Sequence, residues 1–529
     1  MHIGLIPLDE RPVNTRYPEM IAQIAGATLH LPPREMLSAY RKPAHCDDLL
    51  HWLDECQTTA PRLDALIASF QTLGYGGLIA SRTSNEPAST ILSRIESLGK
   101  IKQPYLGRHV GRQLPILGFD LIMRISNANS AVEEPEYWAE EGTRFYQFSQ
   151  LLDRLEQGHA VEDDLTYLRA ELPPRHMQDF IQRRMRNHIV NKAGLQMLGR
   201  GDLDLLVLSS DDTSPYGLPT SEKRSLHLWA DRLGLSEHCS RPTLGCCLLM
   251  YPGADEVGCA LTARVINAAA GWSPTFTVIY GVPGGDQITA PYEDGPVAIT
   301  IQRQAAAVGG HVIAEDTPDL WVFVNPPSPR CTEWDASFAA AEREERMPHL
   351  QKMVKQIRQH TESGEQVIVC DVAYPNGADP LLIELLLDEV DITQLAAYGA
   401  WNTAGNTIGT ALAQGCAARL ARTPEQQAAQ QRFLLHRFLE DWGYQHVVRA
   451  ETRQWLFNTY GRDEPDESTY TATLAHIEAG LNRCQEQLPG FGRLRRVTLA
   501  RTPGRKHHLA PGSLRLPWNR LFEVDFEIL

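Results

Sequence analysis

The chain has 529 residues, which is enough for one large α/β body with additions or for two to four domains. Hydrophobic residues make up 43% and charged residues 22% of it, so the composition excludes disordered and fibrous proteins. There are 50 Lys and Arg against 65 Asp and Glu, a formal net charge of −15. Because an acidic surface repels phosphate backbones, we expect a globular protein that does not bind nucleic acid.

The sequence also indicates where the protein resides. The first residues lack the basic, apolar and cleavage regions of a signal peptide. No run approaches 18 apolar residues, so we expect no membrane-spanning helix. The ten cysteines are scattered without a Cys-x-x-Cys pair, and no two histidines have metal-ligand spacing. These features predict buried thiols, no zinc site and a cytoplasmic location.

Short apolar runs alternate with longer helical patterns along the chain. Leu226, Trp229 and Leu233, for example, recur at helical spacing between two apolar runs. This alternation is typical of parallel strands that are joined by helices and covered on both faces. The ten predicted strands are residues 3–8, 27–31, 64–69, 116–123, 204–209, 244–251, 276–280, 320–325, 366–371 and 395–401.

The same pattern gives a domain organisation. We predict an α/β fold with a parallel-strand (β/α)8-barrel-like body over residues 1–415, with two doubly wound Rossmann-like lobes as the alternative. Within this body, residues 133–201 are polar and strongly helical and form a predicted helical insertion, and residues 285–330 form a possible extra α/β segment. Residues 416–490 are predicted to be helical. Apolar residues alternate in the tail, 491–529, which predicts a small β-containing extension with an exposed ribbon.

Polar clusters follow directly after several predicted strands. In parallel α/β folds the carboxyl ends of the strands meet along one edge, where sites are built. We therefore expect an acidic pocket for the hydroxyl groups of a carbohydrate-like small molecule, with Arg82 and Arg124 as counter-charges and Trp401 or Tyr374 as an apolar platform. The candidate binding residues are Asp9, Glu10, Arg11, Asn14, Arg82, Arg124, Asp255, Glu256, Asp371, Tyr374, Asn376, Asp379, Trp401, Asn402 and Asn406.

Several of these residues also have a purely structural interpretation. Residues 255–256 and Asn402 precede apolar helical stripes and could cap those helices. Asp379 could begin a helix, and residues 9–11 could form a local ion pair. The arginines within residues 183–186 are expected to form a solvated helix face rather than a binding surface.

Three segments together are similar to a known bacterial family. They are PLDERPVN at 7–14, SDD at 210–212 and WNTAGN at 401–406. Over nearly its whole length the chain resembles the proteins grouped as domain-of-unknown-function family 4127. The resemblance implies no particular activity.

A second resemblance has chemical content. The adjacent Asp211 and Asp212, followed by YPN at 374–376, are similar to motifs of the O-GlcNAcase/hyaluronidase-type glycosidases. These are (β/α)8 barrels in which one Asp orients the 2-acetamido group that attacks the anomeric carbon, and the other is general acid and then base. The resemblance implies sugar-binding roles for Asn376 and Asp379. The chain departs from the family's pattern at residues 371–373, where an aromatic-Asp-Asn sequence is expected.

The leading hypothesis is a glycoside hydrolase-like enzyme that acts on a polyhydroxylated sugar, with N-acetylated sugars among the candidate substrates. Asp212 would be the general acid and base, and Asp211 its charged partner. Two carboxyl groups that flank a glycosidic bond suit an oxocarbenium-like transition state, and adjacent placement raises the pKa of one of them. We expect no cofactor.

Two alternatives keep the same pocket. Carboxylate and amide oxygens also suit Mg²⁺ or Mn²⁺, which would make the protein a metal-dependent sugar or phosphate-ester enzyme. Residues 20–31 and 304–313 both have a helix-glycine-strand pattern, which favours a non-catalytic protein whose two lobes close on a small ligand.

Overall fold

The computed structural model describes residues 1–58, 61–102, 113–235, 247–315, 317–487 and 507–529. In these residues the strands form two sheets, and every strand pair within them is parallel. The six-stranded sheet has the order β2-β1-β3-β4-β5-β6, and the five-stranded sheet has the order β11-β10-β9-β7-β8. The strands are β1 (His2–Ile6), β2 (Thr28–His30), β3 (Ala65–Ser69), β4 (Ile116–Ile122), β5 (Leu205–Ser210), β6 (Cys247–Pro252), β7 (Thr275–Tyr280), β8 (His311–Val312), β9 (Leu320–Asn325), β10 (Val367–Asp371) and β11 (Ala397–Gly399).

The two sheets do not join into one barrel. β2 and β6 are the edges of the first sheet, and β11 and β8 are the edges of the second. The predicted closure into a (β/α)8 barrel is therefore not confirmed in the described part of the chain. The mixed α/β class is confirmed, and two parallel sheets agree with the alternative of two lobes.

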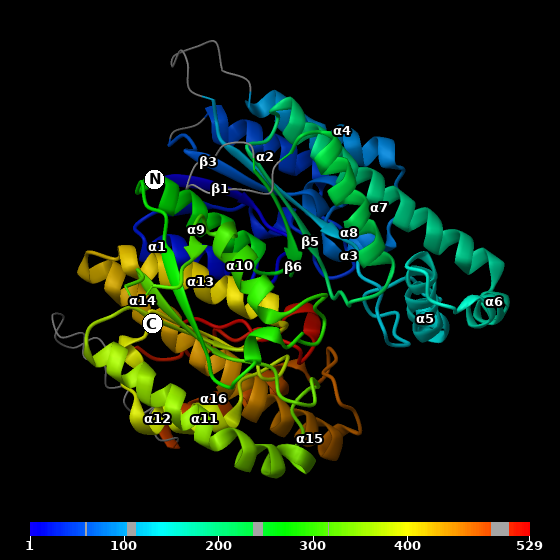
Figure 1. Cartoon of the computed structure of the whole chain (residues 1–529). Coiled ribbons are helices and arrows are strands. Elements are labelled where there is room, and N and C mark those ends of the chain that lie inside the picture. The colour runs from blue at the N-terminus through cyan, green and yellow to red at the C-terminus, as the bar shows by residue number, and fades with distance from the viewer. Residues whose placement is uncertain (59–60, 103–112, 236–246, 316, 488–506) are drawn as a thin grey trace.

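A layer of helices lies between the sheets (Figure 1). It contains α1 (Arg16–Ile24), α9 (Val257–Ala269), α10 (Val297–Ala307) and α13 (Ala404–Leu420). One continuous hydrophobic core includes Leu5 of the first sheet and Val322 of the second. Gly415 lets α13 approach β10 closely, because a Cβ atom there would overlap the side chain of Ile368. The two sheets therefore share one core.

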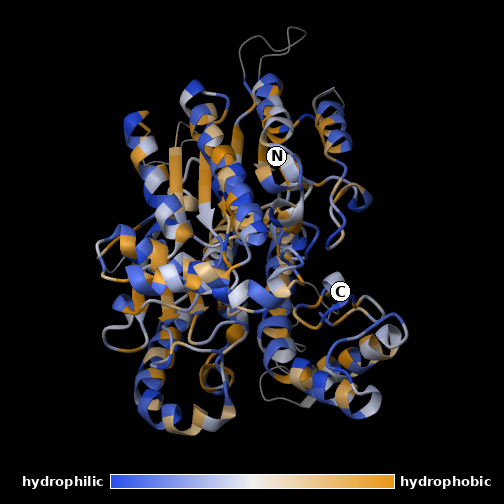
Figure 2. Ribbon diagram, turned by 90° about the vertical axis from the view of Figure 1, so that its right-hand side faces the viewer, coloured by the Kyte–Doolittle hydropathy of each residue, from blue (hydrophilic) through white to orange (hydrophobic). Residues whose placement is uncertain are grey.

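Other helices cover the outer faces of both sheets, so each sheet is buried on two sides. The strands are accordingly apolar along their length, whereas the outer helices alternate between polar and apolar residues (Figure 2). The first sheet packs against α2 (Cys46–Thr58), α4 (Ala88–Lys102), α7 (Pro174–Arg200) and α8 (Leu218–Arg232). The second packs against α11 (Ala336–Glu362), α12 (Pro380–Glu389), α14 (Pro424–Arg437), the π-helix η5 (Phe438–Val448), α15 (Arg449–Tyr460) and α16 (Tyr470–Gln487).

The stretch 133–201 contains helices and no strand. α5 (Trp138–Glu156) and α6 (Glu162–Glu171) project from the body with the first turns of α7 (Figure 1). They have a small aromatic core of their own, which includes Phe145 and Phe180. Residues 285–330 contain α10 of the layer between the sheets, and β8 and β9 of the second sheet.

In the described part of the tail, the predicted ribbon is present only as isolated antiparallel bridges, and the prediction that it is exposed is wrong. Residues 507–529 make only the isolated antiparallel bridges Leu509↔Ile528 and Arg515↔Asp525, and residues 491–506 lie outside the described part. Leu514, Leu521, Val524 and Phe526 are buried in the core of the second sheet, so the alternating apolar residues bury the tail.

Two further expectations concern the thiols and the membrane. Seven described cysteines are free, but Cys247 is disulfide-bonded, so the prediction of free thiols does not hold for it. No helix in the described ranges is long and apolar enough to span a bilayer.

Candidate functional site

The C-terminal ends of strands from both sheets meet at a polar cluster. Asp9 follows β1, Asp255 follows β6 and Asn402 follows β11. Asn402 Nδ2 donates a hydrogen bond to Asp255 Oδ2 at 3.0 Å. The predicted convergence of these three residues therefore occurs, and it joins one sheet to the other.

Arg11 lies at the centre of this cluster. Its Nε donates to Asp9 Oδ2 at 2.9 Å, and its Nη1 donates to Asp255 Oδ2 at 3.1 Å. Asn14 Nδ2 donates to Oδ1 of both carboxylates, at 2.9 and 3.2 Å. All four side chains are buried. Although burial opposes the positive charge, the carboxylates of Asp255 and Asp9 raise the pKa of Arg11, so the guanidinium stays charged. The local ion pair considered for residues 9–11 thus exists and extends to Asp255.

Glu256 and Asn406 support the loop after β6. Asn406 Oδ1 accepts hydrogen bonds from the backbone N–H groups of Ala254 and Asp255, at 3.2 and 3.0 Å. Glu256 accepts from the backbone of Ala254 and from Gln304 Nε2, both at 2.8 Å. Burial raises the pKa of Glu256 to about 7, since no cation pairs with it among the described residues.

The capping interpretation is wrong for these loops. The side chain of Glu256 makes no capping hydrogen bond at the start of α9. At the start of α13 the cap is Thr403 rather than Asn402, and its side chain accepts from the backbone of Asn406. Asp255 and Asn402 are therefore available for the inter-sheet contact.

A second cluster surrounds Asp211 and Asp212, which follow β5. Arg82 from α3 (Leu78–Thr83) donates to Asp211 Oδ2, and Arg124 Nη1 donates to Asp212 Oδ2 at 2.7 Å. Both arginines also donate to Glu133 Oε2, at 2.9 and 3.0 Å. The predicted counter-charges are thus in place. The sequence analysis did not identify Glu133, which begins the predicted helical insertion and does not directly follow a predicted strand.

Asp212 differs from its neighbour in exposure and backbone. Its side chain is 30% exposed, against 11% for Asp211. Its φ of +37° lies in the left-handed region, which residues other than glycine adopt infrequently and at a cost in strain. Burial of the carboxyl and the charge of Asp211 raise the pKa of Asp212 to about 6, against the opposing effect of Arg124 and Arg82. The Asp212 carboxyl therefore titrates near neutral pH.

Further non-glycine residues with positive φ gather at the same strand ends. They include Tyr292, Asn376 and Asn402, with φ of +65°, +62° and +66°. The backbone N–H of Thr213 donates to the Tyr292 carbonyl, and that of Asn376 donates to the Asn402 carbonyl, each at 3.1 Å. Strain of this kind persists only where the surroundings fix it, and it is concentrated at functional sites.

The other predicted residues of the second sheet form a separate network. Arg346 of α11 donates to Asp379 Oδ2 at 2.7 Å and to the Tyr374 hydroxyl at 3.1 Å. Asn325 Nδ2 donates to Asp371 and Asp379, at 2.8 and 3.0 Å. Asp379 is also the N-cap of α12, which agrees with its structural interpretation. Sequence reasoning missed Arg346 and Asn325.

The tail contributes residues that no local pattern indicated. Trp518 Nε1 donates to Glu10 Oε1 at 2.6 Å, and its ring lies 4.8 Å from the Arg11 guanidinium and 4.5 Å from that of Arg520. Arg520 also donates to Glu133, so the tail connects the two clusters. The proposed platform residues Trp401 and Tyr374 are both buried and present no open ring face here.

The expected solvated arginine face on α7 is wrong. Arg184 is buried and pairs with Glu222 at 2.6 Å. Arg186 is buried and donates to the Ser81 carbonyl at 2.7 Å. These arginines attach α7 to neighbouring elements.

The fold and the site define a parallel two-sheet α/β protein with an arginine–carboxylate cluster at the joined strand ends. The chain belongs to the family described as "Protein of unknown function (DUF4127)", which matches residues 3–527. No curated protein and no solved structure matches the chain, so the resemblance to glycosidases receives no support from these comparisons.

Proposed function

We propose that this protein is an enzyme that performs acid–base chemistry on a small polyhydroxylated substrate, with Asp212 as the proton-transferring residue. The observation that carries the proposal is the state of Asp212, which is partly exposed, conformationally strained and titrates near pH 6. A group with such a pKa is present in both protonation states near neutral pH, as general acid–base catalysis requires.

Hydrolysis of a glycosidic bond is the specific reaction that we propose. Protonated Asp212 would donate its proton to the glycosidic oxygen as the bond to the anomeric carbon breaks. Asp211, held by Arg82, would stabilise the positive charge that develops on the sugar. Asp212 would then take a proton from the attacking water. The ion pair with Arg124 would hold the Asp212 carboxyl in position.

The two alternative functions have less support. Lobes that close on a ligand need freedom to move, but here Leu5 and Val322, from different sheets, belong to one continuous core. A divalent-metal site needs several converging donors. The described residues contain no group of three or more His, Cys, Asp or Glu side chains that could hold a metal ion.

A panel of 4-nitrophenyl glycosides, including the N-acetylglucosaminide, tests the proposal. We expect wild-type protein to hydrolyse at least one of them, and Asp212→Asn to lower kcat by roughly 10²–10⁴-fold, the usual contribution of a general acid. Asn tolerates the left-handed conformation, so the variant should fold, which thermal melting checks. Asp163→Asn, at an exposed position on α6, is the matched control. Equal rates for Asp212→Asn and wild type, or no hydrolysis of any glycoside, would refute the proposal.

A further inference from the structure

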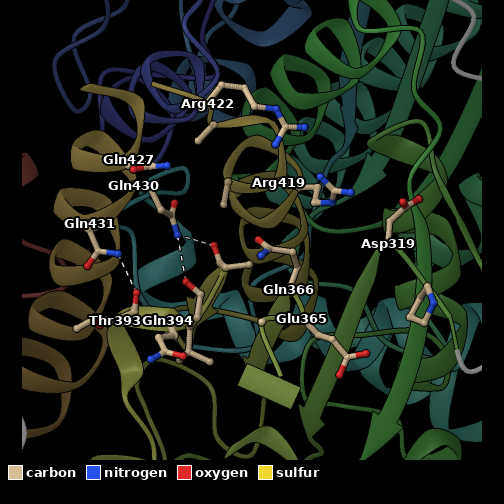
Figure 3. A pocket seen from close by; sticks show the side chains of 16 residues that line it. Asp319, Glu365, Gln366, Thr393, Gln394, Arg419, Arg422, Gln427, Gln430 and Gln431 are labelled. Carbon is tan, nitrogen blue, oxygen red and sulfur yellow. Dashed lines mark hydrogen bonds between the residues drawn. The ribbon is translucent and has the colours of Figure 1, made fainter. Parts of the chain in front are cut away.

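A pocket of about 500 Å³ lies where the strands of the second sheet begin, whereas the candidate site lies where they end (Figure 3). Asp319, Gln366 and Ala396 line it, and they directly precede β9, β10 and β11. The opposite wall is formed by the end of α13 and the first turns of α14. A volume of this size falls within the range of small-molecule sites.

Two arginines supply positive charge to the pocket, which Asp319 and Glu365 also line. Arg419 lies in the last turn of α13 and Arg422 follows that helix, and both side chains line the pocket (Figure 3). No ion pair or hydrogen bond joins either guanidinium to another residue in the described parts of the chain. By contrast, Arg11, Arg82 and Arg124 at the candidate site are all paired with carboxylates.

Among the described residues, no ion pair joins the acidic residues of the pocket to these arginines. Asp319 Oδ2 accepts hydrogen bonds from Trp272 Nε1 at 3.2 Å and from the backbone N–H of Thr275 at 3.0 Å. Glu365 accepts from Trp321 Nε1 at 3.1 Å and is paired with His360 at 2.7 Å. Both carboxylates therefore already have partners on the other side of the pocket.

The helix α14 adds amide groups to the same wall. Gln430 is buried, and its Nε2 donates to the Ala396 carbonyl at 2.6 Å. Gln431 Nε2 donates to the Thr393 carbonyl at 2.8 Å. These bonds fix the wall, whereas the side chain of Gln427 lines the pocket without a side-chain partner among the described residues. The pocket thus offers two guanidinium groups and a free amide on a fixed framework.

We propose that this pocket binds a small anionic molecule through Arg419 and Arg422. Guanidinium groups bind carboxylate and phosphate oxygens in pairs, and such charge-assisted hydrogen bonds are among the stronger ones in proteins. The ligand class is a phosphate-bearing or polycarboxylate metabolite. The site is distinct from the cluster around Asp212, so the inference does not depend on the proposed function.

Isothermal titration calorimetry of the full chain with inorganic phosphate and, separately, with citrate tests the inference. We expect saturable binding of at least one probe with one site per chain, and a matching rise in melting temperature. The probe that binds more tightly shows which class of oxyanion the pocket prefers. Arg419→Gln/Arg422→Gln should weaken binding at least about tenfold, the effect of losing charge-assisted contacts.

A control variant separates a site from general charge attraction. Arg34→Gln/Arg169→Gln removes the same charge from two exposed arginines outside the pocket and should bind like wild type. Arg419→Lys/Arg422→Lys keeps the charge but loses the planar fork, so it should bind more weakly than wild type. The inference is overturned if neither probe binds saturably up to about 10 mM, or if both glutamine double variants lose affinity equally. Glycoside hydrolysis is not a readout here, so its failure and the failure of this site are distinguishable.

Discussion

Asn402 donates a hydrogen bond to Asp255 across 3.0 Å, and this bond joins the ends of strands that belong to different sheets. Asp255 in turn binds Arg11, which pairs with Asp9 at the end of β1. The polar cluster that sequence reasoning expected around a substrate is therefore also the connection between the two sheets. We therefore expect a substitution in this cluster to lower the stability of the fold, whether or not it also changes activity.

Replacing Arg11 should strongly destabilise the protein. Arg11→Met leaves the buried carboxylates of Asp9 and Asp255 without their cation, and loss of one partner of a buried ion pair costs about 3–5 kcal/mol. Urea unfolding at pH 7 measures the change. Arg483→Met is the control, because Arg483 and Glu451 are 45% and 47% exposed, and exposed pairs contribute at most about 1 kcal/mol. Equal losses in the two variants would contradict a central role for Arg11.

The strands could be predicted because each is buried on both faces and so appears as a continuous apolar run. β9, for example, lies within the predicted run 320–325. β8 has only two residues at a sheet edge, and it was not among the ten predicted strands. The sequence indicated the division into two sheets only through the alternative of two Rossmann-like lobes, because the division depends on packing after β6. The sequence did contain a signal for it, since α9 is buried on all sides, as a helix between two sheets must be.

Asp9 and Asp255 could be predicted to converge, because both follow parallel strands of one sheet. Asn402 follows a strand of the other sheet, so its contact with Asp255 depends on how the two sheets pack. Other partners of the strand-end residues could not be predicted. Trp518 reaches Glu10 from 508 residues further along the chain, and no periodic pattern encodes such a contact. Arg346 lies within a long polar helix, where its burial depends on the packing of α11 against the second sheet.

The titration of Glu256 should make stability depend on pH. Burial raises its pKa from 4.5 to about 7, so the folded state binds this proton more tightly than the unfolded state. Its stabilising contribution is complete below about pH 4.5 and is lost as the pH rises towards 7. Glu256→Gln removes this effect, and Gln304 can rotate to accept from the new amide, since its Oε1 has no partner in the described residues.

Wild type loses stability between pH 5 and pH 8 as Glu256 ionises, whereas Glu256→Gln does not. We therefore expect the stability of Glu256→Gln relative to wild type, measured as the difference in the free energy of unfolding, to be higher at pH 8 than at pH 5 by up to about 3 kcal/mol. Urea unfolding at both pH values gives the comparison. Glu344→Gln, at an exposed position on α11, should show no such change. A difference that is the same at both pH values would show that Glu256 does not titrate in this range.

The pH dependence of activity should respond to Arg124. If protonated Asp212 is the catalytic acid, kcat/KM falls as the pH rises through its pKa, which is about 6. The positive charge of Arg124, 2.7 Å from Asp212 Oδ2, holds that pKa down. Arg124→Gln removes the charge, so the falling limb should move to higher pH by at least about one pH unit. Arg144→Gln, which breaks the peripheral pair with Glu141, should leave the limb in place. A uniform loss of activity with an unmoved limb would mean that Arg124 only supports the fold and that Asp212 does not set the pH profile.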